Sequence, residues 1–70
     1  MSLRLDCTGR LCPLPVLELA RHIHEVAVGE TVVVVSDDPA AASDIPAWCR
    51  LRGQEFVSAA GNDYVVRRVH

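Results

Sequence analysis

The local sequence Cys12-Pro13-Leu14-Pro15 places a thiol directly before a predicted helix. At a helix start, the positive end of the helix dipole and unpaired backbone N–H groups favour a thiolate, which lowers a cysteine pKa below its free value of about 8.5. Both prolines lack an N–H donor and have a fixed φ, so they hold the thiol at a stiff corner. Arg10 adds positive charge to the same loop. We therefore expect Cys12 to be nucleophilic, with a buried structural thiol as the alternative.

The residues around this thiol argue against two classes of cysteine enzyme. Pro15 occupies the position at which a thioredoxin-like Cys-x-x-Cys motif carries its resolving cysteine, so dithiol exchange within the motif is excluded. Acyl transfer by cysteine needs a positioned base, and the sequence alone places no histidine beside Cys12. A reactive thiol that lacks such groups is more typical of a carrier than of an enzyme.

The other two cysteines fall on apolar faces of predicted elements. Cys7 continues the apolar side of a strand, so we expect it in the core, with a regulatory disulfide to Cys12 as the alternative. Cys49 lies on the apolar side of a helix and is expected in the core. No close pair of cysteines or histidines has zinc-ligand spacing, so we expect no metal, and no motif predicts a cofactor.

The charged residues exclude several further functions. The chain has seven Arg, no Lys and a net charge of −2, which excludes Schiff-base chemistry and a P-loop and predicts no direct binding to nucleic acid. Asp37 and Asp38 precede a proline and are interpreted as a helix cap rather than as catalytic carboxylates, and Asp44 likewise. Arg67 and Arg68 are interpreted as a solvated strand end, with a docking patch for an acidic partner as the alternative.

The length of 70 residues predicts a single domain covering residues 1–70. Half of the residues are apolar, mostly aliphatic, which is typical of a globular core. The sequence begins without the pattern of a signal peptide, and its longest run of large apolar residues, 32–35, is far shorter than the roughly 20 residues that span a bilayer. We expect a soluble cytoplasmic protein with no membrane contact.

Hydrophobic periodicity and turn residues predict six elements. They are a strand at 3–7, a helix of about four turns from Pro13 towards Gly29, a strand at 31–36, a helix from Pro39 to Gly53, and a hairpin of strands 55–59 and 64–69. Pro46 predicts a bend or restart of the second helix near residues 43–46. The order β-α-β-α-β-β predicts an α/β two-layer sandwich, with a four-stranded mixed sheet and both helices on one face.

Residues 5–16, centred on the Cys-Pro-x-Pro motif, resemble the signature of the TusA (SirA-like) family of small sulfur-carrier proteins. A second block resembles the same family. It consists of Gly29-Glu30, the valine strand, Asp37-Asp38-Pro39 and residues 44–49, followed by Gly53 at the expected place. Two motifs in the correct order cover nearly the whole chain, so the resemblance is specific.

The resemblance implies that Cys12 accepts sulfane sulfur as a persulfide from a cysteine desulfurase or a rhodanese-type donor and passes it to an acceptor protein. The pathways of the family include tRNA thiolation, molybdenum-cofactor biosynthesis and sulfur oxidation. Arg10 and Leu11 reverse the order of basic and apolar residues that is common before the family's cysteine, which affects the expected partner contacts. A regulatory or adaptor module that binds proteins without carrying sulfur is the alternative function.

Overall fold

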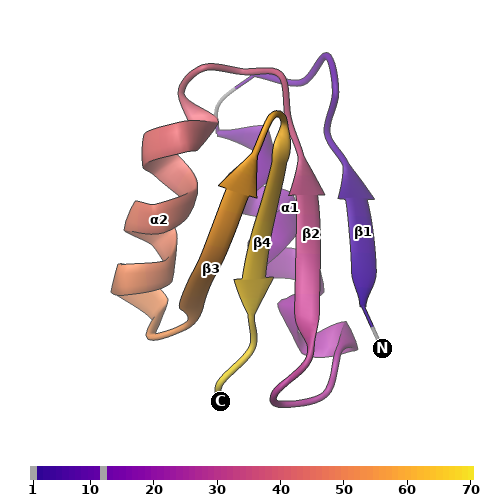
Figure 1. The fold of residues 1–70 in the computed structure, drawn as a ribbon, viewed down its shortest axis with the longest axis vertical. Helices are drawn as coiled ribbons and strands as arrows, with labels where there is room; N and C mark the ends of the chain where they lie inside the picture. Colours follow the sequence, from indigo (N-terminus) through magenta and orange to yellow (C-terminus); the bar gives the residue numbers. More distant parts are fainter. Residues whose placement is uncertain (1, 12) are drawn as a thin grey trace.

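The structure, a computed structural model, describes residues 2–11 and 13–70. Its elements, in chain order, are β1 (Leu3–Asp6), α1 (Leu14–His22), the 3₁₀ turn η1 (Ile23–Glu25), β2 (Thr31–Val35), α2 (Ala41–Arg52), β3 (Glu55–Ala60) and β4 (Asp63–Arg67) (Figure 1). This succession confirms the predicted β-α-β-α-β-β order.

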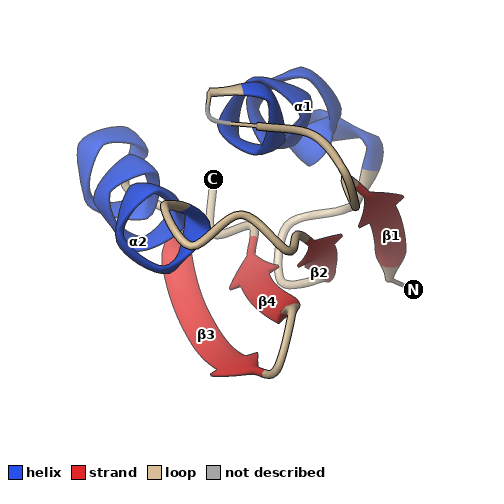
Figure 2. Cartoon of the chain, turned by 90° about the horizontal axis from the view of Figure 1, so that it is seen from above, coloured by secondary structure: helices blue, strands red, loops and turns tan. Residues whose placement is uncertain are grey.

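The four strands form one mixed sheet in the order β1-β2-β4-β3. β1 pairs with β2 in parallel, whereas β4 pairs with β2 and β3 in antiparallel fashion. Figure 2 shows both helices on the same face of this sheet, which confirms the predicted two-layer α/β sandwich. Because β1 and β2 are parallel, their carboxyl ends meet at one edge, and α1 and α2 both start from that end of the molecule (Figure 1).

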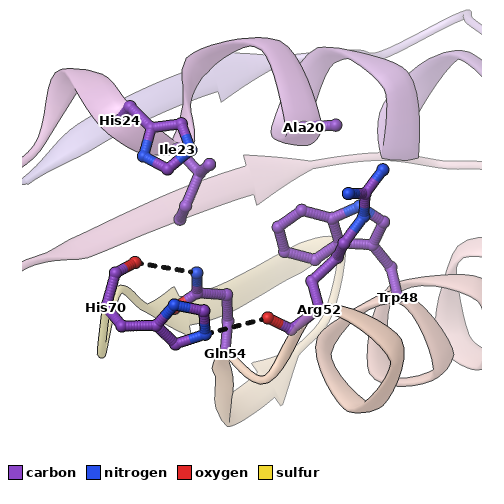
Figure 3. Close-up of a pocket in the computed structure, with 7 residues that line it drawn as sticks. All are labelled: Ala20, Ile23, His24, Trp48, Arg52, Gln54 and His70. Carbon is purple, nitrogen blue, oxygen red and sulfur yellow. Dashed lines mark hydrogen bonds between the residues drawn. The ribbon is translucent and has the colours of Figure 1, made fainter.

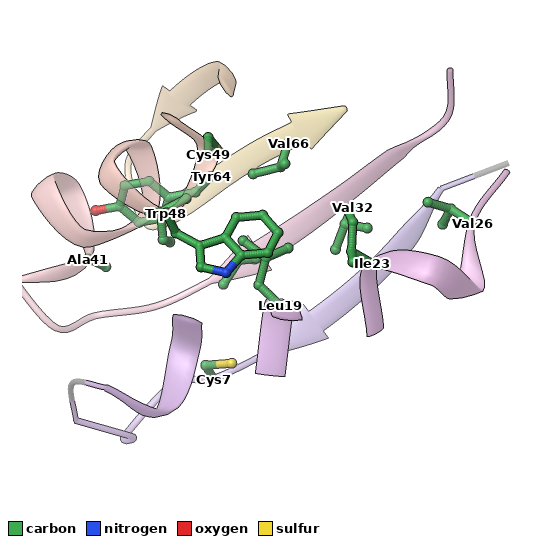
Figure 4. Packing of buried hydrophobic residues seen from close by; sticks show 12 residues of the cluster. Cys7, Leu19, Ile23, Val26, Val32, Ala41, Trp48, Cys49, Tyr64 and Val66 are labelled. Atoms are coloured by element: carbon green, nitrogen blue, oxygen red, sulfur yellow. The ribbon is translucent and has the colours of Figure 1, made fainter. Parts of the chain in front are cut away.

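The core lies between the sheet and the two helices, and the valine-rich strand β2 runs through its centre. Val32 and Val34 are fully buried on the helix side, while their neighbours in β2 face the uncovered side and are half-buried. This alternation is typical of a central strand with one covered face. The core cluster comprises Cys7, Leu19, Ile23, Val26, Val32, Val34, Ala41, Ile45, Trp48, Cys49, Tyr64 and Val66 (Figure 4).

The first helix is shorter than the four turns that its apolar stripe predicts. α1 begins at Leu14, one residue later than expected, and gives way to η1 after His22. The backbone is extended at Val26. A 3₁₀ turn has three residues per turn, so it places Ile23 and Val26 on the same side, where both are buried. The apolar spacing that resembled a longer helix thus comes from a tighter turn leading towards β2.

The second helix has no break at Pro46, contrary to the prediction. α2 runs without interruption from Ala41 to Arg52 and ends at Gly53, whose φ of 73° is the left-handed conformation predicted for a helix end. Pro46 removes only the hydrogen bond to the carbonyl of Ala42, an exposed residue near the helix start, where water can solvate the freed oxygen. Asp44 lies inside this helix rather than capping a separate segment.

Asp38 and Asp37 have different roles before α2. The Asp38 carboxylate accepts a hydrogen bond from the backbone N–H of Ala40 at 3.0 Å, in the turn that precedes the helix. Ala40 is the N-cap of α2 and receives no side-chain capping bond, so the predicted cap lies one turn too early in the chain. Asp37 does not cap the helix. Its carboxylate accepts a hydrogen bond from the N–H of Gly9, in the loop that follows β1.

The predicted hairpin is confirmed, with slightly different strand ends. β3 and β4 are joined by a turn at Gly61 and Asn62, and Asp63 belongs to β4. The pairing shifts between Phe56 and Ser58, so Val57 is the extra residue of a β-bulge in the edge strand.

Candidate functional site

The predicted nucleophile, Cys12, lies outside the described residues, so the site is defined here by the residues on either side. On the preceding side, the N–H of Cys7 donates to the carbonyl of Val35 at 2.7 Å, which extends the pairing of β1 with β2. The N–H of Arg10 then donates to the carbonyl of Cys7 at 3.0 Å and closes a turn around Gly9, whose φ is 80°. This turn directs the chain towards α1.

Two aspartates hold this turn in place. The Asp6 carboxylate accepts a hydrogen bond from the N–H of Thr8 at 3.0 Å, and hydrogen bonds from Thr8 lower the pKa of Asp6. The Asp37 carboxylate accepts a hydrogen bond from the N–H of Gly9, also at 3.0 Å. Gly9 and Asp37 are 28 residues apart, so the second bond ties the loop after β1 to the loop after β2. The parallel pairing of the two strands makes this contact possible.

On the following side, two backbone hydrogen bonds lead into α1. The N–H of Leu14 donates to the carbonyl of Leu11 at 2.9 Å, and the N–H of Leu17 donates to the carbonyl of Pro13 at 3.0 Å. Pro13 is the residue that precedes the helix, and Pro15 is its second residue. An N–H in the first helical turn has no partner inside the helix, so Pro15 costs no hydrogen bond there. The helix starts at Leu14, two residues after the candidate thiol in sequence.

Glu18 of α1 contacts several charged or basic side chains near the start of the helix. Its carboxylate lies 4.0 Å from the Arg10 guanidinium, 3.8 Å from that of Arg21 and 3.2 Å from Nε2 of His22. Nδ1 of His22 contacts Glu25 in turn. The predicted positive charge of Arg10 is thus present in the loop, but it is shared with a carboxylate, and solvent screens the pair.

An exposed apolar surface flanks Cys12 in sequence, and the sequence reasoning did not identify it. Leu11, Leu14 and Leu17 are exposed to 72%, 42% and 54%, and we call these three residues the leucine strip. Leu14 and Leu17 are three positions apart and therefore share a helix face. Leu11 lies one turn before them, joined to Leu14 by a backbone hydrogen bond. The signal in the sequence was the position of these leucines, which lie outside the apolar stripe that α1 turns towards the sheet.

The two described cysteines belong to the core, as expected. Cys7 and Cys49 are 1% and 2% exposed, and both are free thiols. Burial, and after it the negative charge of Glu18, raises the pKa of the Cys7 thiol. Burial raises the pKa of the Cys49 thiol to about 11. Both thiols therefore stay protonated at neutral pH and are poor nucleophiles. The alternative prediction, a disulfide between Cys7 and Cys12, concerns a residue outside the described ones and stays a prediction.

The histidines do not form a catalytic group with the described loop residues. His22 is engaged by Glu18 and Glu25 on the polar side of α1. His24 and His70 line a cavity beside the end of α1, roughly ten residues from the helix start, or about 15 Å along the helix axis. Within residues 2–11 and 13–70, no group of three histidine, cysteine or acidic side chains is placed to hold a metal ion, and no helix is long and apolar enough to cross a membrane.

Comparisons with known proteins point to the family that the sequence resembles. A family model described as "Sulfurtransferase TusA" matches residues 3–68. A protein of Archaeoglobus fulgidus named "Putative sulfur carrier protein" is 44% identical over 54 residues, which cover 77% of this chain and 70% of the archaeal protein. The family match spans both blocks of the sequence and nearly all of the fold.

Proposed function

Because the chain belongs to the TusA sulfurtransferase family, we propose that it is a sulfur carrier and that Cys12 holds the sulfur as a persulfide. The observation that carries this proposal is the family match over residues 3–68, which includes the Cys-Pro-x-Pro motif. Burial of Cys7 and Cys49 supports the choice of Cys12, since a carrier thiol must be reached by two partner proteins in turn.

The proposed transfer is a thiolate exchange on sulfane sulfur. The Cys12 thiolate attacks the terminal sulfur of a donor persulfide. A bond forms between the Cys12 Sγ atom and that terminal sulfur, while the bond between the terminal sulfur and the donor cysteine breaks. The donor leaves as a thiolate, and no external oxidant or reductant is needed. An acceptor thiolate then attacks the terminal sulfur on Cys12, which releases the Cys12 thiolate.

The leucine strip supports docking of a donor and an acceptor at this end of the molecule. Exposed aliphatic side chains of this kind are covered when a partner protein binds, which contributes apolar burial around the reacting sulfur. A cysteine desulfurase or a rhodanese-type enzyme is the proposed donor class. The acceptor decides whether the sulfur enters tRNA thiolation, molybdenum-cofactor biosynthesis or sulfur oxidation. The chain itself supplies a carrier rather than a complete catalytic site.

The test is to incubate the protein with a cysteine desulfurase and cysteine and then to measure its intact mass. We expect the mass of one added sulfur atom, which dithiothreitol removes. Cys12→Ser should gain none. Cys49→Ala is the matched control, because it also removes one thiol but leaves Cys12 in place.

Absence of added sulfur with desulfurase and rhodanese-type donors alike would favour the adaptor function over the carrier. Sulfur gained equally by Cys12→Ser would place the carrier function on another residue. Rapid turnover of disulfide substrates by the isolated protein would instead indicate a thiol-redox enzyme.

A further inference from the structure

The two faces of the sheet are covered to different degrees. Both helices lie on one face, and beside their ends the tail of the chain is held by a hydrogen bond from Nε2 of Gln54 to the carbonyl of His70 at 3.2 Å (Figure 3). Within residues 2–11 and 13–70, no helix lies on the opposite face (Figure 2). We call this opposite face of the four strands the open face.

The open face is formed by the residues that alternate with the core residues along each strand. The pairing register places Val33 beside Val65, and Val35 lies two positions further along β2. The polar and charged residues around these three valines are Arg4, Asp6, Thr31, Glu55, Ser58, Asp63 and Arg67. An apolar centre with a polar rim is the organisation of a protein–protein interface.

The sequence of β2 is that of a strand buried on both sides. Residues 32–35 are four consecutive valines, whereas a strand with one solvated face normally alternates apolar and polar residues. The helix side of the sheet buries only Val32 and Val34. Val33 and Val35 stay half-buried, so the fold of one chain accounts for half of the valine run. A second surface packed on the open face accounts for the other half.

The charges of the open face are complementary to those of a second copy. Asp63 and Arg67 lie two positions before and two positions after Val65 in β4. A two-fold axis that runs parallel to the sheet and crosses β4 at Val65 therefore brings Arg67 of one copy opposite Asp63 of the other. Because Val33 is paired with Val65, the same axis places each of these valines opposite its own counterpart. Opposite charges at the rim and apolar contacts at the centre both favour this arrangement.

The ion pairs within the chain are compatible with such a contact. Arg4 lies 3.6 Å from Asp63, and Arg67 lies 2.9 Å from Glu55. All four side chains are at least 41% exposed, so solvent screens both pairs. Each guanidinium has five N–H donors, and each carboxylate accepts more than one hydrogen bond, so both retain capacity for a second partner. Arg4 lies on the axis, but its guanidinium leans towards Asp63 and therefore away from its counterpart.

We propose that the open face is a dimer interface and that its occupant is a second copy of this chain, packed sheet against sheet. The proposal is independent of the sulfur-carrier function, because the leucine strip lies on α1, on the helix side, and stays free in this dimer. Four strands of about five residues have a flat area of roughly 300 Å². Since specific interfaces bury at least about 1,000 Å² in total, we expect a weak dimer that forms at high protein concentration.

Sedimentation equilibrium of the full chain measures this association, with a reductant present so that no disulfide links two copies. As the protein concentration rises from about 20 µM to about 1 mM, we expect the average mass to increase from that of the 7.6 kDa monomer towards that of a dimer. An average mass that stays at the monomer value throughout this range would overturn the proposal.

A charge swap tests the two-fold arrangement. Asp63→Arg and Arg67→Asp should each weaken the dimer by about tenfold, because each substitution places like charges opposite one another. The two substitutions together should restore the association, since opposite charges then meet again. The double variant leaves both ion pairs within the chain broken, so recovery can arise only from contacts between copies. Absence of recovery would overturn the arrangement.

Leu17→Asp is the control for the position of the interface, because it places a charge in the leucine strip on the helix side. It should leave the dimer unchanged. Loss of the dimer in Leu17→Asp, with no effect of the single charge reversals, would place the interface on the leucine strip and overturn the proposal.

Discussion

The two ends of the helical layer differ in what they offer to other molecules. At the loop end, where the loops after β1 and β2 meet the start of α1, the leucine strip exposes aliphatic side chains. At the tail end, where α1 and α2 finish beside residues 68–70, polar donors surround a small cavity. An exposed apolar strip is a surface that another protein can cover, whereas at the tail end Gln54 and His70 are held by hydrogen bonds within the chain. The difference makes the loop end the better candidate surface for a partner protein.

The largest expected effect separates the thiol of the loop end from the two thiols of the core. In the folded protein at pH 7.5, iodoacetamide should modify Cys12 about 100-fold faster than Cys7 or Cys49, because both core thiols are buried and have raised pKa values. Peptide mass spectrometry after timed labelling measures the three rates. Labelling of Cys49 should increase as the pH rises towards its pKa of about 11, since a raised pKa keeps the thiol protonated below that value.

Denatured protein provides the control for this labelling, because unfolding exposes all three cysteines and should make their rates similar. Modification of Cys7 as fast as Cys12 in the folded protein would remove the contrast between the loop end and the core.

The fold could largely be predicted from periodicity, because a strand or helix with one apolar face leaves a regular pattern in the sequence. The predictions were wrong where one sequence pattern is compatible with two local backbone structures. Ile23 and Val26 suit either a longer helix or a 3₁₀ turn, and only packing against the sheet decides between them. Pro46 normally breaks a helix, but whether the freed carbonyl meets water depends on the surroundings of Ala42.

The candidate site could be predicted only in part. Cys12 could be proposed because its chemistry depends on neighbours in the sequence. The hydrogen bond from Gly9 to Asp37 could not, because it joins residues 28 positions apart, and its existence depends on the parallel pairing of β1 and β2. The cavity at the tail end likewise combines side chains from three separate stretches of the chain, which are residues 20–24, residues 48–54 and His70.

A second, smaller effect tests the apolar character of the loop end. Leu17→Asp should slow sulfur transfer from a protein donor by about tenfold, because it places a charge in the surface that the donor is proposed to cover. Loading from a small-molecule persulfide should not change, since the small donor needs no docking surface. Initial rates with the two donors give the comparison.

Leu51→Asp is the control for this substitution, since Leu51 is 81% exposed on α2 and lies outside the leucine strip. An equal loss of transfer in both variants, or no loss in either, would contradict the role of the strip.

The smallest expected effect concerns the tie between the two loops. Asp37→Ala removes the acceptor for the Gly9 N–H and should lower the free energy of unfolding by about 1 kcal/mol. Sulfur transfer should also slow a few-fold, because the turn that directs the chain towards α1 is less well held. Asp37→Asn keeps an oxygen that can accept the bond and should behave nearly as the original protein. Urea unfolding and transfer rates, measured on both variants, check this; equal behaviour of Ala and Asn would count against the tie.

The bulge at Val57 has a consequence for how other proteins can bind. An edge strand with regular unpaired N–H and C=O groups invites another chain to extend the sheet. Here β3 is interrupted by the bulge, and the opposite edge, β1, has only four residues. Neither edge provides a long template for strand addition. A partner protein therefore has to recognise the side chains of this protein rather than the backbone of an edge strand. For the proposed carrier, the choice between one partner and the next then depends on the side chains that each partner covers.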